Sequence, residues 1–159
     1  NTALGFTPSF SLTTGSYNVA MGYQPLFNNI SGNYNIALGY LSLFSNTAGS
    51  NIAIGRQAMY TKTTGSGNVA LGDYTLFKNK VGNYSVAIGY EALYEDSIGV
   101  NQVAIGYQAL KGGKSNQDNI AIGTSPMSIG ANTGIRNIAI GTNALQNNKN
   151  GGYNIAQGA

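Results

Sequence analysis

The chain lacks cysteine, histidine and tryptophan altogether, and only 8% of its 159 residues are charged. Without cysteine, a disulfide scaffold and a thiolate metal site are excluded. Without histidine, the commonest general base and the commonest metal ligand of proteins are missing. No apolar run approaches the ~20 residues of a membrane-spanning helix, so we expect no membrane insertion. Eight lysine and arginine residues give a net charge of only +3, which is too sparse for nucleic-acid binding.

Glycine and asparagine are abundant instead. The chain contains 23 glycines and 21 asparagines, and 42% of its residues are hydrophobic. This apolar content is too high for a disordered Gly/Asn-rich linker. A chain of low charge that combines these features is typical of an array of internal repeats.

One motif, apolar-Ala-apolar-Gly, recurs along the whole chain. Asparagine precedes the motif in eight of its ten copies, and Ser85 and Gln102 are the exceptions. Large residues alternate with alanine at a period of two, which indicates a short β-strand. Residues 1–159 are therefore predicted to form a single repeat array without a domain boundary. The motif ends at the almost evenly spaced Gly5, Gly22, Gly39, Gly55, Gly72, Gly89, Gly106, Gly123, Gly141 and Gly158.

The remainder of each repeat also has fixed positions. A leucine or methionine follows the motif glycine by four residues in eight copies, and a second glycine often follows it by ten. All three prolines, Pro8, Pro25 and Pro126, follow the motif glycine by three residues. Because proline has no N–H to donate, this position is predicted to lie in a bend and to donate no ladder hydrogen bond.

A period of about 17 residues with short strands and glycine-marked turns predicts an all-β fold, a parallel β-solenoid of ten coils. Coils in such a stack are ~4.8 Å apart, so the array would be a rod of roughly 45 Å. The asparagine before each strand has two interpretations. We favour a ladder of side-chain amides that bonds each coil to the coils above and below. The alternative is a simple turn preference.

The alanine of the motif is expected to face a close wall of protein, because no other residue occupies its position in ten copies. Strand alternation places Asn, Ala and Gly on one face and the large apolar residues on the other. We expect the large residues to form the core and the alanine face to pack between chains. The alternative is that it faces the opposite wall of its own coil. This predicted trimer or close-packing face comprises Ala20, Ala37, Ala53, Ala70, Ala87, Ala104, Ala121 and Ala139.

Few residues are candidates for chemistry. Glu91, Glu95 and Asp96 form the one acidic cluster, in a bend that we expect to be solvated. A glycosidase needs two carboxylates that face each other across a substrate, and this cluster lies on one bend. We therefore predict no catalytic residues, no cofactor and no metal site; weak Ca²⁺ binding by the cluster is a minor alternative.

Lysines form a second candidate group. Lys80, Lys114 and Lys149 follow the motif glycine by eight residues on alternate coils, and Lys62 and Lys78 are nearby in sequence. They would form a basic ridge, and the first three are possible contacts for acidic cell-surface glycans. The alternative is that they only keep the rod soluble and its edges charged.

Tyrosines recur at two positions, directly after the motif glycine and five residues before it. We favour stacked ladders that stabilise the array over sugar-binding platforms. The residues are Tyr23, Tyr40, Tyr90 and Tyr107 at the first position, and Tyr17, Tyr34, Tyr84 and Tyr153 at the second.

The motif Asn-(Val/Ile)-Ala-Ile-Gly, followed by Tyr-Gln-Ala-Leu at residues 107–110, resembles the head repeats of YadA-like trimeric autotransporter adhesins. It is still more similar to the longer repeats of phage tail fibres and other surface fibres. The adhesin pattern Asn-Ser-Val-Ala-Ile-Gly has a shorter period, and here Asn-Ser is reduced to Asn. The resemblance covers the entire chain. It implies a left-handed parallel β-roll, three chains side by side and a role in attachment.

The function expected from these features is a non-enzymatic structural or adhesive segment of a longer extracellular trimeric fibre, on a phage tail or a bacterial surface. Its partners would be two further copies of itself and a surface glycan or other receptor, without nucleic acid. The alternative is a monomeric β-solenoid module that binds glycans. A carbohydrate-degrading enzyme is disfavoured because paired carboxylates are missing.

Overall fold

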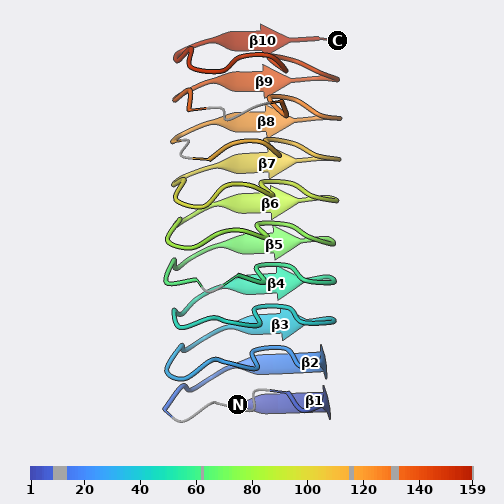
Figure 1. The fold of residues 1–159 in the computed structure, drawn as a ribbon, viewed down its shortest axis with the longest axis vertical. Coiled ribbons are helices and arrows are strands. Elements are labelled where there is room, and N and C mark those ends of the chain that lie inside the picture. Colours follow the sequence, from blue (N-terminus) through green and yellow to red (C-terminus); the bar gives the residue numbers. More distant parts are fainter. Residues whose placement is uncertain (9–13, 62, 115–116, 130–132, 159) are drawn as a thin grey trace.

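The computed structural model describes residues 1–8, 14–61, 63–114, 117–129 and 133–158. Ten strands form one parallel sheet in sequence order, and the described residues contain no helix. The chain returns from the end of each strand to the start of the next, so it winds as a β-solenoid of stacked coils (Figure 1). The predicted all-β parallel solenoid is therefore confirmed. The strands are β1 Thr2–Phe6, β2 Val19–Tyr23, β3 Ile36–Leu38, β4 Ile52–Ile54, β5 Val69–Leu71, β6 Val86–Ile88, β7 Val103–Ile105, β8 Ile120–Ile122, β9 Ile138–Ile140 and β10 Ile155–Gln157.

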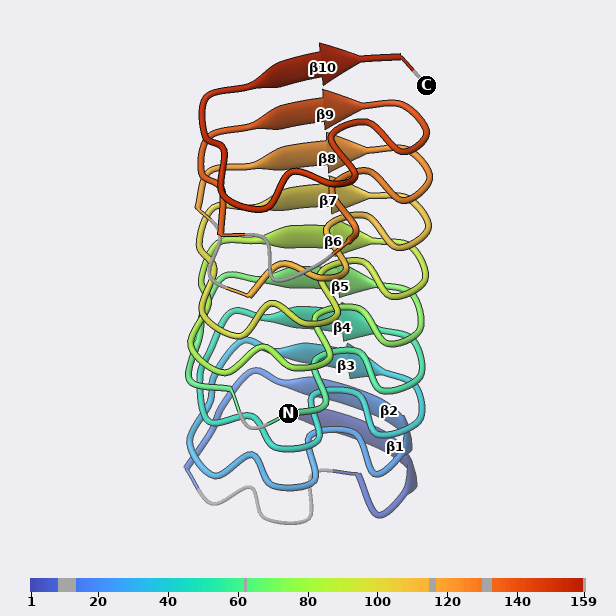
Figure 2. The same cartoon turned by 45° about the horizontal axis from the view of Figure 1, so that its top comes forward.

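The strands pair in the register of the sequence motif. Ala87 of β6 lies opposite Ala104 of β7, and this alanine-to-alanine pairing holds for every neighbouring pair of strands. The shortest and the longest repeats keep the same register, so the return paths absorb the difference in length. Figure 2 shows these return paths stacked on one another opposite the sheet. Residues at one position of the repeat therefore form a column along the solenoid.

The core lies inside each coil, and its location corrects one of the predictions. The motif alanines are buried in one cluster with the leucines and methionines of the return path. The large residues on either side of each alanine are partly exposed, for example Val103 and Ile105 around Ala104. The expected position of the alanines between chains is wrong, and they face the opposite wall of their own coil: Ala20, Ala37, Ala53, Ala70, Ala87, Ala104, Ala121 and Ala139. The physical reason is the thin interior, where the return-path leucine leaves room only for a methyl group.

The bend after each strand depends on left-handed backbone. After Gly89, whose φ is 118°, Glu91 and Leu93 have φ values of 55° and 53°. The residue between them, Ala92, donates its N–H only locally, to the carbonyl oxygen of Gly89 at 3.4 Å. Proline fits this position because no ladder bond is lost, as predicted. A Cβ on Gly89 would lie 2.5 Å from the carbonyl oxygen of Gly106, so both the φ value and the close contact require glycine.

The asparagines before the strands form a ladder, with a bonding pattern different from the one predicted. The Oδ1 atom of Asn18 accepts the backbone N–H of Asn35 at 2.8 Å, and its Nδ2 donates to the carbonyl oxygen of Gly32 at 2.8 Å. Each side chain therefore bonds mainly to the backbone of the following coil. The pattern recurs throughout the asparagine ladder, which comprises Asn1, Asn18, Asn35, Asn51, Asn68, Asn119 and Asn137.

Candidate functional site

A groove opens on the return-path side of the solenoid. It has a volume of about 400 Å³ and is lined by Thr61, Phe77, Lys78, Lys80, Glu95, Ser97 and Lys114. These residues come from the return paths that follow β4, β5, β6 and β7. A second hollow of about 300 Å³ lies at the same two positions of earlier repeats, where Asn28, Ile30, Ser45 and Thr47 line it. The repeat therefore produces a series of hollows along the solenoid.

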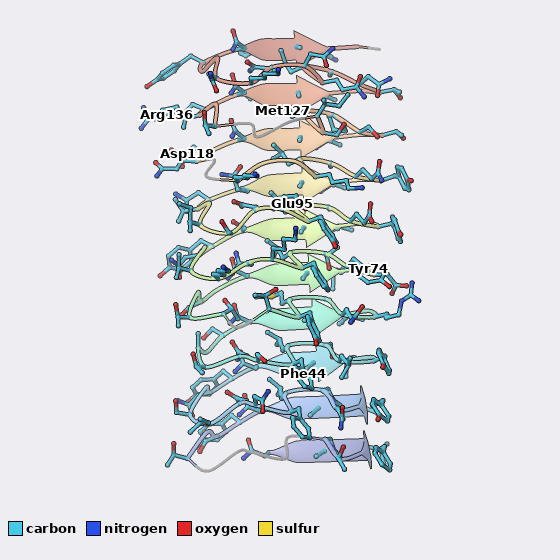
Figure 3. All side chains as sticks on the ribbon, viewed as in Figure 1. Phe44, Tyr74, Glu95, Asp118, Met127 and Arg136 are labelled. Carbon is cyan, nitrogen blue, oxygen red and sulfur yellow. The ribbon has the colours of Figure 1, made fainter. Side chains whose placement is uncertain are left out.

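One wall of the groove belongs to an aromatic column. Five rings stack with neighbouring centroids 5.0 to 5.3 Å apart. Phe77 lies between Tyr60 and Tyr94, so both faces of its ring are covered and its edge lines the groove. Phe44, labelled in Figure 3, belongs to the same column. The sequence signals these aromatics, five residues after the motif glycine, but the column and the groove are visible only in the structure. Its members are Phe27, Phe44, Tyr60, Phe77 and Tyr94.

An ion pair between two coils contributes to the groove lining. Both oxygens of Glu95 accept hydrogen bonds from the ammonium of Lys78, at 2.7 and 2.9 Å. The pKa of Lys78 is raised by this hydrogen bond to Glu95. Figure 3 shows the position of Glu95 on the solenoid. Because the pair is partly exposed, it contributes little to stability, and its main effect is to hold the carboxylate in place.

Three further ion pairs connect neighbouring coils elsewhere on the surface. Glu91 lies 2.6 Å from the ammonium of Lys111, and two Arg–Asp pairs have distances of 3.4 and 3.5 Å. The arginine pairs are Arg56 with Asp73 and Arg136 with Asp118, and Figure 3 labels the second of them. Four of the five carboxylates therefore have a basic partner.

The fifth carboxylate, Asp96, is buried, which corrects the prediction of a solvated acidic bend. One of its oxygens accepts the backbone N–H of Gly99 at 2.9 Å, and the other, Oδ2, has no partner. Burial raises the pKa of Asp96 to about 7, above the usual 3.8. Glu91 and Glu95 point to separate lysines, so the three acids do not form one site. Within the described ranges, no group of three acidic residues could hold a metal ion.

Part of the predicted basic ridge lies at the groove. Lys80 and Lys114 line the groove together with Lys78. Neither Lys80 nor Lys114 forms an ion pair with a described residue, and both are exposed. Lys149 is exposed at the same repeat position but lies outside the groove lining. Lys62 lies outside the described residues.

The column that contains these lysines is continuous between coils. The backbone N–H of Lys80 donates to the carbonyl oxygen of Ser97 at 2.9 Å. The hydroxyl of Ser97 donates in turn to the carbonyl oxygen of Lys114 at 3.3 Å. The two free ammonium groups therefore lie two coils apart in one column, with a serine between them.

The predicted tyrosine ladders are confirmed for part of the set. Tyr17 stacks on Tyr34 with ring centroids 4.9 Å apart. At the other position, Phe6, Tyr23 and Tyr40 stack successively, as do Tyr90 and Tyr107 at 5.7 Å. Arg56 and Asp73 occupy that position on the intervening coils and replace stacking by an ion pair. Tyr153 contacts Arg136 instead of a second tyrosine, since its hydroxyl accepts a hydrogen bond from the guanidinium at 2.5 Å.

The outer side of the sheet is a second candidate surface. In β2 to β9, the two large apolar side chains that flank the alanine point outward and are exposed or only partly buried. The ten described strands contain no charged residue. Sequence reasoning assigned these residues to the core, because their size and repetition match a buried strand face. We call this surface the outer face; it comprises the residues that flank the motif alanine, such as Val86 and Ile88.

Comparison of the chain with models of protein families, with curated proteins and with solved structures found no match. Among the residues that the structure describes, no helix has the length and apolar character needed to cross a membrane. The groove and the outer face are therefore interpreted from their own chemistry.

Proposed function

We propose that this chain is a non-enzymatic rod segment of an extracellular trimeric fibre, on a phage tail or a bacterial surface, that serves attachment. The observation that carries the proposal is the outer face. Its apolar side chains are continuous over ten strands, and no described part of the chain covers them. The resemblance of the repeats to fibre repeats supports three copies and a role in attachment.

The size of the outer face fits an interface between copies. The residues that flank the alanines form a strip about three residues wide, which corresponds to roughly 10 Å by 45 Å, or roughly 450 Å². The aromatic rings of the tyrosine position widen this strip on the coils that carry them. Monomeric proteins rarely expose continuous apolar patches beyond about 300–600 Å², whereas a stable interface buries about 800 Å² per partner. A closed ring of three copies would cover all three outer faces symmetrically.

The distribution of carboxylates supports a mechanical role over a catalytic one. The four partly exposed carboxylates each have a basic partner, and Asp96 is buried within its own coil. General acid–base catalysis by carboxylates uses groups that face a substrate with suitably tuned pKa values. A rod with repeated binding surfaces gains attachment strength through many weak contacts.

The mass of the purified chain in solution tests the proposal. Light scattering is expected to give three times the chain mass of 16.5 kDa. Ile88→Lys, in the middle of the outer face, is expected to give monomers that keep the parent circular dichroism. Ser31→Lys adds the same charge at an exposed return-path position and should stay trimeric. A monomeric parent at high concentration would contradict the trimer.

A second candidate function is a monomeric solenoid module that binds glycans. The groove favours it, because its lining comes from one chain and needs no second copy. A monomeric parent that still binds a glycan through the groove would support this function over the fibre.

A further inference from the structure

We propose that the groove binds an acidic polysaccharide, which lies along the solenoid axis and places its carboxylate or sulfate groups on Lys80 and Lys114. The inference names the ligand for the proposed attachment role and rests on that role for its biological setting. The groove itself belongs to a single chain. It can therefore be tested separately from the oligomeric state.

The distribution of charge is the first argument. The structure describes seven basic residues, and four of them are paired with carboxylates. The other three described basic residues, Lys80, Lys114 and Lys149, share one repeat position. Two of the three, Lys80 and Lys114, line the same groove and form no ion pair with a described residue. A partner that fills this groove gains most if it carries negative charge.

The spacing of the lysines is the second argument. Lys80 and Lys114 are two coils apart, which is about 9.6 Å in a parallel stack. One coil matches roughly the length of one pyranose unit, so a polysaccharide parallel to the axis would present every second sugar to a lysine. This spacing suits a polymer that carries an acidic group on at least every second sugar. Lys149 continues the same repeat position beyond the groove.

The neutral groups of the lining complete the match. Ser97 and Thr61 contribute hydroxyl groups, and the two Glu95 oxygens, fixed by Lys78, can accept hydrogen bonds from sugar hydroxyls. The edge of Phe77 offers an apolar wall. Ligand sites for small molecules combine such apolar surface with a few placed polar groups. Because the groove is open and spans several coils, and a second hollow lies at the same positions of earlier repeats, it suits a polymer better than an enclosed small molecule.

The same geometry argues against single-stranded nucleic acid, the other common anionic polymer. Bases bind such grooves by stacking on exposed aromatic faces. Both faces of Phe77 are already covered by Tyr60 and Tyr94. The groove therefore offers cations and hydroxyl groups, but no platform for a base.

Binding to defined polymers tests the inference. The purified full chain is titrated by calorimetry with dextran sulfate fragments, polygalacturonate fragments, neutral dextran and a single-stranded oligonucleotide. We expect binding to at least one of the two acidic polysaccharides, and which of them binds distinguishes sulfate from carboxylate recognition. The double variant Lys80→Gln/Lys114→Gln should bind about tenfold more weakly. Arg56→Gln/Arg136→Gln removes the same charge outside the groove and should change the affinity less than about twofold.

Three results would overturn the inference. These are equal weakening by the two double variants, equal binding of dextran, or stronger binding of the oligonucleotide. Light scattering on every variant separates the two proposals. A trimeric chain that fails to bind either acidic polymer would overturn the groove site and leave the fibre proposal standing. A monomeric chain that binds through Lys80 and Lys114 would overturn the fibre proposal and leave the groove site standing.

Discussion

The side-chain oxygen of Asn18 accepts the backbone N–H of Asn35 at 2.8 Å, one coil further along the solenoid. The Nδ2 of Asn18 also donates to Gly32, so one amide bonds to two backbone groups of the next coil. Both asparagines are buried. Buried polar groups are costly unless they are hydrogen-bonded, so the bonds favour the motif register over any slipped pairing.

The asparagine ladder is interrupted at Ser85, and restoring it should stabilise the chain. The Ser85 hydroxyl accepts the N–H of Gln102 at a long 3.3 Å and cannot reach the following turn as an amide would. In Ser85→Asn, the new Oδ1 would accept the Gln102 N–H, and Nδ2 would donate to the carbonyl oxygen of Gly99. We expect a gain of about 1 kcal/mol in the free energy of unfolding, measured by denaturant titration. The control Ser128→Asn lies outside the ladder, at a position where no described asparagine bonds to a neighbouring coil, and an equal gain there would contradict the explanation.

The buried carboxyl of Asp96 should make stability depend on pH. Its pKa is about 7 in the folded chain against a usual 3.8, so the folded state holds its proton more tightly. The preference of the folded state for protonated Asp96 therefore stabilises the chain fully below pH 3.8. This contribution to the free energy of unfolding falls as pH rises and is lost above about pH 7. Asp96→Asn removes this dependence, because asparagine at this repeat position bonds both groups of the turn, as Asn29 does with Gly32.

At pH 8 we therefore expect Asp96→Asn to have a free energy of unfolding about a few kcal/mol higher than that of the parent, which follows from the size of the pKa shift of Asp96. The difference should shrink towards pH 4. Unfolding curves at several pH values measure it. Glu95→Gln, at a partly exposed position, is the control, with an effect of at most about 1 kcal/mol at any pH. A gain from Asp96→Asn that does not vary with pH would contradict a buried protonated carboxyl.

Because the motif alanines point into the core, replacing one of them by a larger residue should lower the free energy of unfolding. Ala104 is fully buried between the sheet and the return path, so Ala104→Leu is expected to cost about 1–3 kcal/mol through overpacking. Val103→Leu enlarges a neighbouring side chain on the outer face and should cost less than about 1 kcal/mol. Thermal unfolding of the two variants gives the comparison. The opposite order of stabilities would place the alanines outside the core.

The sequence by itself was sufficient for much of the fold. The recurrence of the motif glycines determined the number of strands, their positions and their register, since only matching positions can stack in an array of this period. The shared position of Pro25 and Pro126 correctly indicated a repeat position that donates no ladder hydrogen bond, as Ala92 shows on another coil. Asparagine in eight copies correctly indicated a ladder, although its acceptors in the backbone of the next coil depend on how close the turn lies.

Which strand face is buried was decided only by the tertiary structure. Alternation separates Ala104 from Val103 and Ile105, but a period of two is the same whichever face points inward. The choice depends on the distance to the return path, where Leu93 and its equivalents adopt left-handed backbone and fill the interior. The groove arises in the same way. Lys80, Glu95 and Lys114 belong to three different repeats and meet only because successive return paths lie directly on one another.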